Sequence, residues 1–194
     1  MRRIECTGGF VAFLCLMCYL DPSGCFFPFL LAAGVHEAAH LLTLRMMRAP
    51  IHKLRLSLGG AQLITAPLPY GREILAAAAG PAANLLLLLL TLRSRPVHAL
   101  VNAALLLYNL LPFYPLDGGR VLRAVCALAL PAPAAVRTER IVCTVSLLAL
   151  GVGAVYLTCV LHVGLWPVLL FGSLLLRSER ENSPKSRSFL RVRS

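Results

Sequence analysis

Long apolar runs constrain this chain more than any other feature of its sequence. A helix that crosses a bilayer needs about 20 mostly apolar residues, and several runs reach or approach that length. Only 14% of the residues are charged, against about 25% in a typical soluble domain. A water-soluble globule and a disordered chain are therefore excluded. We predict an all-α polytopic membrane protein with about six transmembrane helices, at residues 10–20, 26–44, 74–92, 97–111, 141–161 and 163–176.

The basic residues predict how these helices are oriented. A net charge of +11 would suggest nucleic acid in a soluble protein, but in a membrane protein it reports topology first. If six helices cross and the N-terminus is cytosolic, every lysine and arginine except Arg93 and Arg95 falls on the cytosolic side. We therefore expect a multi-pass protein of the cell membrane with both termini in the cytosol, the lipid bilayer as a partner and no nucleic acid.

The two ends of the chain differ from the membrane domain, which we place at residues 1–176. Residues 177–194 are basic and serine-rich without an apolar period, which predicts a disordered cytosolic tail near anionic lipid. The short run 10–20 has an alternative interpretation as a signal-peptide core that precedes a lipoprotein cysteine, Cys25. Pro22 stands where such a signal needs an apolar residue, so a helix is favoured.

Residues 51–65 change from helical periodicity to alternation. Leu54, Leu56 and Leu58 alternate with polar residues before the Gly59-Gly60 pair. Alternation around a glycine pair is typical of a β-hairpin. We expect a small hairpin on the cytosolic side between the second and third helices; the alternative is an irregular interfacial loop.

The second apolar run contains the sequence His-Glu-Ala-Ala-His. At about 100° per residue, His36 and His40 lie about 40° apart on one helix face, with Glu37 beside them. Two imidazoles at this spacing can bind one zinc ion, and the neighbouring carboxylate can accept a proton from water. The alternative, two buried histidines without a metal, would place three polar groups in lipid, where ionisable residues are costly.

A third ligand is expected, because catalytic zinc usually has three protein ligands and one open position. The chain has two aspartates, and Asp21 belongs to a turn on the outer side. Asp117 follows the fourth apolar run at its cytosolic end, the side towards which His36 and His40 point. We expect the surrounding prolines and glycines to release this carboxylate from helical geometry, so that it turns inward. The alternative is an ordinary loop with a helix-capping aspartate.

These motifs together resemble the site-2 protease family of intramembrane zinc metalloproteases, particularly its sporulation sigma-factor-processing branch. The resemblance covers roughly residues 26–125 and includes Gly80-Pro81-Ala-Ala-Asn84 and Asn109-x-x-Pro-x-x-Pro-Leu-Asp117-Gly-Gly as well as the histidine motif. It implies that zinc is the cofactor. The implied roles are zinc ligands for His36, His40 and Asp117, general base for Glu37, and substrate or oxyanion contacts for Asn84 and Asn109.

The resemblance also implies a substrate class. It implies hydrolysis of a membrane-tethered protein in regulated intramembrane proteolysis, with a sigma-factor proprotein or an anti-sigma factor as substrate and regulatory membrane proteins as further partners. Members of the sporulation branch commonly carry a nucleotide-sensing CBS pair after the last helix. Residues 177–194 are too few to hold one, so we expect no CBS domain.

Two other functions use the same residues. In a metal transporter, the histidines and the aspartate would form a transient site, but further ligands along the membrane normal would be expected and the sequence has no such series. A noncatalytic scaffold is the second alternative, and the intact Glu37 between the histidines argues against it.

Overall fold

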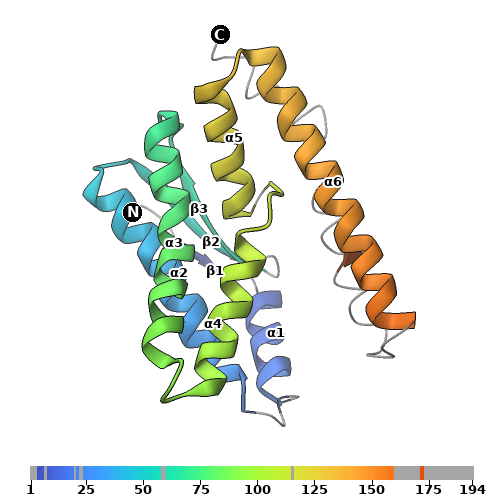
Figure 1. Ribbon diagram of the computed structural model, residues 1–194. Helices are drawn as coiled ribbons and strands as arrows, with labels where there is room; N and C mark the ends of the chain where they lie inside the picture. Colours follow the sequence, from blue (N-terminus) through green and yellow to red (C-terminus); the bar gives the residue numbers. More distant parts are fainter. Residues whose placement is uncertain are drawn as a thin grey trace. The chain divides into compact units, whose positions relative to one another are not determined.

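The computed structural model describes residues 4–6, 8–19, 21, 24–57, 60–114, 116–159 and 171–172. These residues belong to two compact units, Met1–Leu110 and Leu111–Ser194, which are described separately. Among the described residues, the first unit contains four helices and a small sheet, and the second contains two helices (Figure 1).

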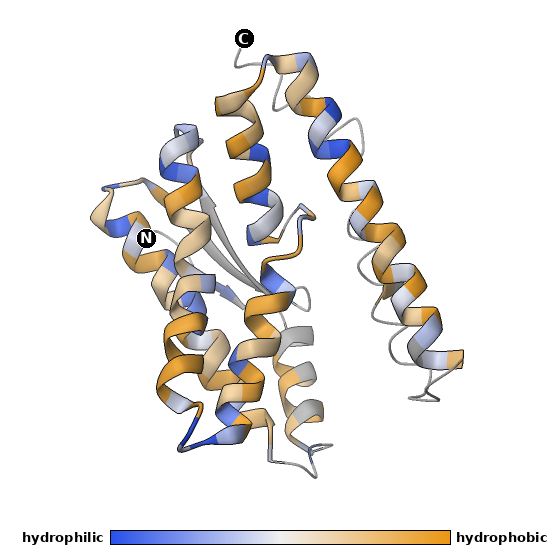
Figure 2. Cartoon of the chain, viewed as in Figure 1, coloured by the Kyte–Doolittle hydropathy of each residue, from blue (hydrophilic) through white to orange (hydrophobic). Residues whose placement is uncertain are grey.

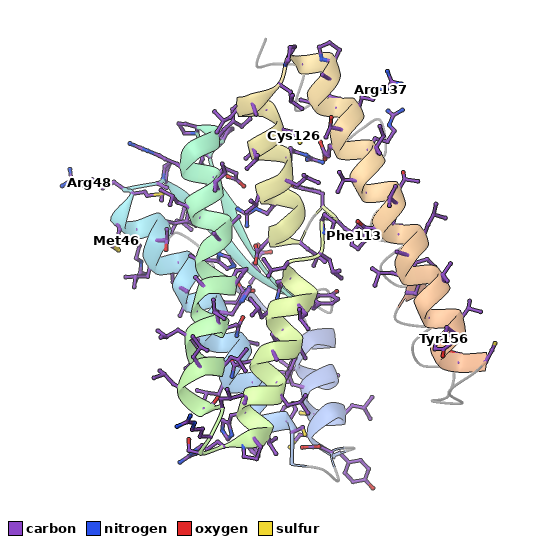
Figure 3. The ribbon with its side chains drawn as sticks, in the orientation of Figure 1. Met46, Arg48, Phe113, Cys126, Arg137 and Tyr156 are labelled. Atoms are coloured by element: carbon purple, nitrogen blue, oxygen red, sulfur yellow. The ribbon has the colours of Figure 1, made fainter. Side chains whose placement is uncertain are left out.

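The first unit is built on α2 (Phe26–Met46), α3 (Tyr70–Thr91) and α4 (Pro96–Asn109), with α1 (Gly8–Tyr19) before them. Both α3 and α4 pack against α2 and against each other. The start of α2 is fixed by Asp21, whose carboxylate accepts a hydrogen bond from the Phe26 amide at 2.7 Å. It ends where Arg48 adopts a left-handed conformation with φ 54° and the Ala49 amide bonds back to the Leu44 carbonyl (Figure 3).

Between α2 and α3 the chain forms two antiparallel strands, β2 (Ile51–Ser57) and β3 (Gly60–Thr65). They fall within the range expected to form strands; of the expected Gly59-Gly60 turn, Gly60 is the first residue of β3 and residue 59 lies outside the described residues. Their register pairs Ile51 with Thr65 and Leu54 with Leu63. A third strand, β1 (Ile4–Cys6), pairs in parallel with β2, so β2 is the central strand of the described sheet.

The second unit contains α5 (Asp117–Ala129) and α6 (Ala132–Cys159). The expectation that Asp117 lies outside helical geometry is wrong, because it is the first residue of α5. The two glycines that follow it do not release the chain from helical geometry, because they lie in the first turn of this helix. The fifth helix was expected from residue 141, whereas α6 begins nine residues earlier through a more polar segment with Arg137 and Glu139. The expected helix at 163–176 lies almost entirely outside the described residues.

Three helices within the described part of the chain are long and apolar enough to cross a membrane: α2, α3 and the Ala132–Tyr156 portion of α6. The expected runs at 10–20 and 97–111 do form helices, but α1 has 12 residues and α4 has 14. Figure 2 shows apolar colouring over much of α3 and α4 and hydrophilic colouring in their short connection. The described residues thus form a mainly helical membrane protein.

Candidate metal centre

His36 and His40 lie one turn apart on the face of α2 that is covered by α3. Both are 6% exposed, and their Nε2 atoms are 3.1 Å apart. Their rings meet edge to face, with centroids separated by 4.7 Å. The spacing inferred from the sequence therefore places two imidazoles together inside the helical packing of the first unit.

The other nitrogen of each ring is held by α3. His36 Nδ1 lies 2.6 Å from the Asn84 side-chain oxygen, and His40 Nδ1 lies 2.7 Å from the Ala76 backbone oxygen. Oxygens of these types only accept hydrogen bonds, so both Nδ1 atoms carry the hydrogen. In neutral rings the two Nε2 atoms then present bare lone pairs towards the same point.

Two facing lone pairs at 3.1 Å repel each other unless a cation lies between or beside them. An imidazole that donates from one nitrogen to an oxygen and presents the other is the usual arrangement of a metal-ligating histidine. The donor set, two neutral nitrogens in a buried position, suits zinc. The residues of this unit therefore fit a zinc ion.

Gly80 is the residue of α3 that faces the histidine pair. A Cβ atom built there would lie 2.6 Å from His36 Nε2 and closer still to His40 Nε2. Real Cβ atoms essentially never approach other atoms this closely. Ala76, Gly80 and Asn84 recur every four residues on one face of α3, so this face supplies a carbonyl, an open space and an amide to the two imidazoles.

Asn84 is fully buried, and its amide group is used completely within the first unit. Its oxygen faces His36, while its Nδ2 donates to the Asn102 side-chain oxygen at 2.9 Å and to the Ala32 carbonyl at 3.3 Å. An amide nitrogen has two hydrogens, and both have acceptors here. The structure thus gives Asn84 partners other than the substrate or oxyanion expected from the resemblance.

Asp117 lies in the second unit, at the start of α5, and is 6% exposed. A carboxylate in the first turn of a helix is stabilised by the partial positive charge of the free N–H groups there. Arg120, one turn later, approaches it at 3.4 Å. A buried carboxylate held in this way can act as a metal ligand.

The remaining predicted residues occupy two helices of the first unit. Glu37 is half-buried on α2, between the histidines. Asn109 is half-buried at the end of α4, where its Nδ2 donates to the Leu105 carbonyl at 3.0 Å.

Asn102 was missed by the sequence analysis, although it is 3% exposed and hydrogen-bonded to Asn84. A signal was present, because an amide within an apolar run is costly and therefore points to a functional role. It also stands seven residues before Asn109 and so shares its helix face.

Comparison with known proteins gives two findings. The sequence profile of peptidase family M50 matches residues 93–152, a segment that contains Asn109 and Asp117 but not the histidine motif. The structure resembles that of the site-2 protease from Methanocaldococcus jannaschii, with a TM-score of 0.63 at 20% identity, over 93% of this chain and 90% of that chain. A search of curated proteins gave no match.

The structural likeness establishes the fold, and the profile match shows that the segment around Asp117 is similar to peptidase family M50. The paired Nε2 atoms add, independently of both, a site whose donors suit zinc. Together these findings show a membrane protein with the fold of a site-2 protease and a segment similar to peptidase family M50.

Proposed function

We propose that this protein is an intramembrane zinc protease that cleaves membrane-tethered proteins. The observation that carries the proposal is the convergence of His36 Nε2 and His40 Nε2, with each Nδ1 directed to an oxygen of α3. Bound zinc supplies a Lewis acid that polarises the scissile carbonyl and lowers the pKa of a water molecule towards about 7.

The proposed zinc ligands are His36, His40 and Asp117. The histidines have the tautomer that zinc requires, and Asp117 is a buried carboxylate that follows α4 in the segment matched by the peptidase profile. Two imidazoles and one carboxylate leave a fourth position open for catalysis. The fold likeness to a site-2 protease supports this set.

Glu37 is the proposed general base. It adjoins His36 in sequence and lies about 60° from His40 around α2. Its carboxylate accepts a proton from the attacking water and later delivers that proton to the leaving amine nitrogen. Proton transfer by a positioned carboxylate contributes roughly 10²- to 10⁴-fold to the rate.

Asn109 is the proposed contact to the substrate. An amide carries two N–H donors, and the bond to the Leu105 carbonyl uses one of them. The second can donate to the oxyanion or to the substrate backbone. We assign Asn84 a different role, the orientation of His36, because its donors are already used.

The substrate must be unwound, because a helix protects its own carbonyls in backbone hydrogen bonds. β3 is an edge strand of the described sheet, and such an edge can pair with an extended peptide. The resemblance to the site-2 protease family implies a sigma-factor proprotein or an anti-sigma factor as the natural substrate. The distribution of arginines and lysines supports a site open to the cytosol and cytosolic termini.

Reconstitution in vesicles tests the proposal. The purified chain should cleave a membrane-tethered peptide only when zinc is present, and Glu37→Gln should retain stoichiometric zinc while cleavage falls at least about 10²-fold. Glu73→Gln, the same change in the first turn of α3, serves as the control and should remain active. Zinc flux into the vesicles without cleavage would show a transporter instead, and full activity of Glu37→Gln would contradict the role of the base.

A further inference from the structure

Asn102 is a buried amide for which the proposed mechanism has no use. It lies in the middle of α4, is 3% exposed, and belongs to a run of mostly apolar residues. Its side chain connects two helices: the oxygen accepts from Asn84 of α3 at 2.9 Å, and the nitrogen donates to the His98 carbonyl of its own helix at 2.8 Å.

The bond to His98 fixes the direction of the whole chain of hydrogen bonds. A backbone carbonyl can only accept, so Asn102 must present its nitrogen to His98 and its oxygen to Asn84. Asn84 must then present its nitrogen to Asn102 and its oxygen to His36. His36 consequently carries its hydrogen on Nδ1, so Nε2 of the neutral ring carries a lone pair and no hydrogen.

We propose that Asn102 is a positioning residue that keeps His36 in its metal-binding tautomer, acting through Asn84. This inference rests on the proposed zinc site. The Ala32 carbonyl also accepts from Asn84, but at 3.3 Å, which is longer than the 2.9 Å bond to Asn102. Asn102 thus makes the stronger of the two contacts that hold the amide of Asn84 in orientation.

In the opposite tautomer of His36, the two histidines would hydrogen-bond to each other. With its hydrogen on Nε2, His36 would donate directly to His40 Nε2, which lies 3.1 Å away. Because His40 Nδ1–H is already bonded to Ala76, His40 can accept that bond. Their mutual hydrogen bond would then leave neither Nε2 atom with a lone pair for a metal. The hydrogen bonds from Asn102 through Asn84 to His36 prevent this arrangement.

Three variants separate this role from a general effect on packing. Asn102→Leu has a similar size but cannot accept from Asn84. Asn102→Asp keeps an oxygen that can accept from Asn84 in either protonation state, so it should rescue the function. Thr91→Val removes a side-chain bond to a carbonyl four residues earlier on α3, and it should leave zinc affinity unchanged.

Two measurements decide the matter. In the metal-free chain at alkaline pH, ring-nitrogen NMR shifts of His36, assigned by their loss in His36→Ala, should show Nδ1–H in the parent chain and in Asn102→Asp. A population with Nε2–H should appear in Asn102→Leu. Zinc affinity, measured by chelator competition, should fall about 10-fold in Asn102→Leu, at the lower end of outer-shell effects, and recover in Asn102→Asp.

The outcomes distinguish this inference from the proposed function. A parent chain that binds no zinc contradicts the zinc site, while the NMR spectra of the metal-free chain still decide the tautomer. Parental ring-nitrogen shifts and zinc affinity in a folded Asn102→Leu chain overturn the inference. If Asn102→Leu does not fold, an Nε2–H signal from His36 in Asn102→Asp overturns it, and parental shifts there support it.

Discussion

His36 and His40 make hydrogen bonds to residues far away in the sequence, whereas Asp117 forms an ion pair with a near neighbour. The partners of the histidines, Asn84 and Ala76, come from α3, 48 and 36 positions further along the chain. Asp117 begins α5, and its ion-pair partner Arg120 is one turn away. The two parts of the proposed ligand set are thus supported by different kinds of contact.

The segment around Asp117 is itself tightly packed. A Cβ atom at Gly119 would overlap the Phe113 carbonyl group and the Tyr114 amide nitrogen, so the chain before α5 passes directly over the first turn of that helix. The Arg123 guanidinium lies 4.1 Å from the centre of the Tyr114 ring and binds Glu139 of α6 at 2.7 Å.

Because their contacts differ, the histidines and the aspartate should respond to substitutions in different parts of the chain. Changes on α3 or α4 should alter the histidines, and changes between Phe113 and Arg123 should alter the aspartate. Each prediction below tests whether the two parts respond separately.

The largest effect is expected from Gly80→Ala. The added methyl group would occupy the position where both Nε2 atoms converge, so it must displace at least one imidazole. Replacing a residue that only supports a metal ligand lowers metal affinity roughly 10- to 100-fold, and we expect a larger fall in zinc affinity here. The free energy of unfolding should decrease by about 1–3 kcal/mol. Gly71→Ala, in the same helix but in open space, should change neither. If Gly80→Ala binds stoichiometric zinc with parental affinity, His36 and His40 are not zinc ligands.

Asp117→Ala should have the next largest effect, because it removes one proposed ligand and changes no residue of the first unit. Zinc affinity should again fall by more than about 100-fold. The ring-nitrogen shifts of His36 in the metal-free chain should stay parental, since its contacts to Asn84 lie wholly within the first unit. Unchanged zinc affinity would exclude Asp117 as a ligand, and a shifted His36 tautomer would show that the two parts are not independent.

Gly119→Ala should have an intermediate effect, confined to the aspartate. The new Cβ would meet backbone atoms, which cannot move aside like a flexible side chain, so the start of α5 must shift. We expect a loss of about 1–3 kcal/mol in the free energy of unfolding and a loss of zinc affinity smaller than in Asp117→Ala. Gly153→Ala, in open space on α6, is the matched control. Parental stability and zinc affinity in Gly119→Ala would show that this close packing does not position Asp117.

The smallest effect is expected from Arg123→Ala. It removes a partly exposed ion pair to Glu139, worth at most about 1 kcal/mol, and a cation–π contact to Tyr114 of about 0.5–1 kcal/mol. The free energy of unfolding should therefore fall by about 1–2 kcal/mol in a denaturant titration. Arg137→Ala is the control, because this exposed side chain points away from α5 (Figure 3). Equal stability in the two variants would show that the contacts of Arg123 do not hold the segment before α5.

The sequence predicted the helices that consist mostly of apolar residues and missed α5, which does not. Runs of apolar residues located α2, α3 and α4 within a few residues of their ends. α5 was missed because two arginines interrupt its apolar residues and two glycines stand in its first turn, a composition that favours a loop. β1 has three residues, too few to show an alternating pattern.

For the metal site, the sequence identified candidate ligands but not the residues that orient them by hydrogen bonds and packing. The spacing of His36 and His40 on one helix fixes their common face, so their proximity follows from helical geometry. The roles of Asn84 and Asn102 depend on how α2, α3 and α4 pack, and no local pattern encodes which amide meets which ring. The close approach of Gly80 likewise depends on packing between helices.

The most direct test of the central claim is the zinc X-ray absorption spectrum of the purified, zinc-loaded chain. The account predicts a first shell with two imidazole nitrogens and carboxylate or water oxygens, at about 2.0–2.2 Å. The chain contains seven cysteines, so sulfur ligands are a real alternative. Scattering from sulfur at about 2.3 Å, or a spectrum unchanged when His36 and His40 are both replaced by alanine, would contradict it.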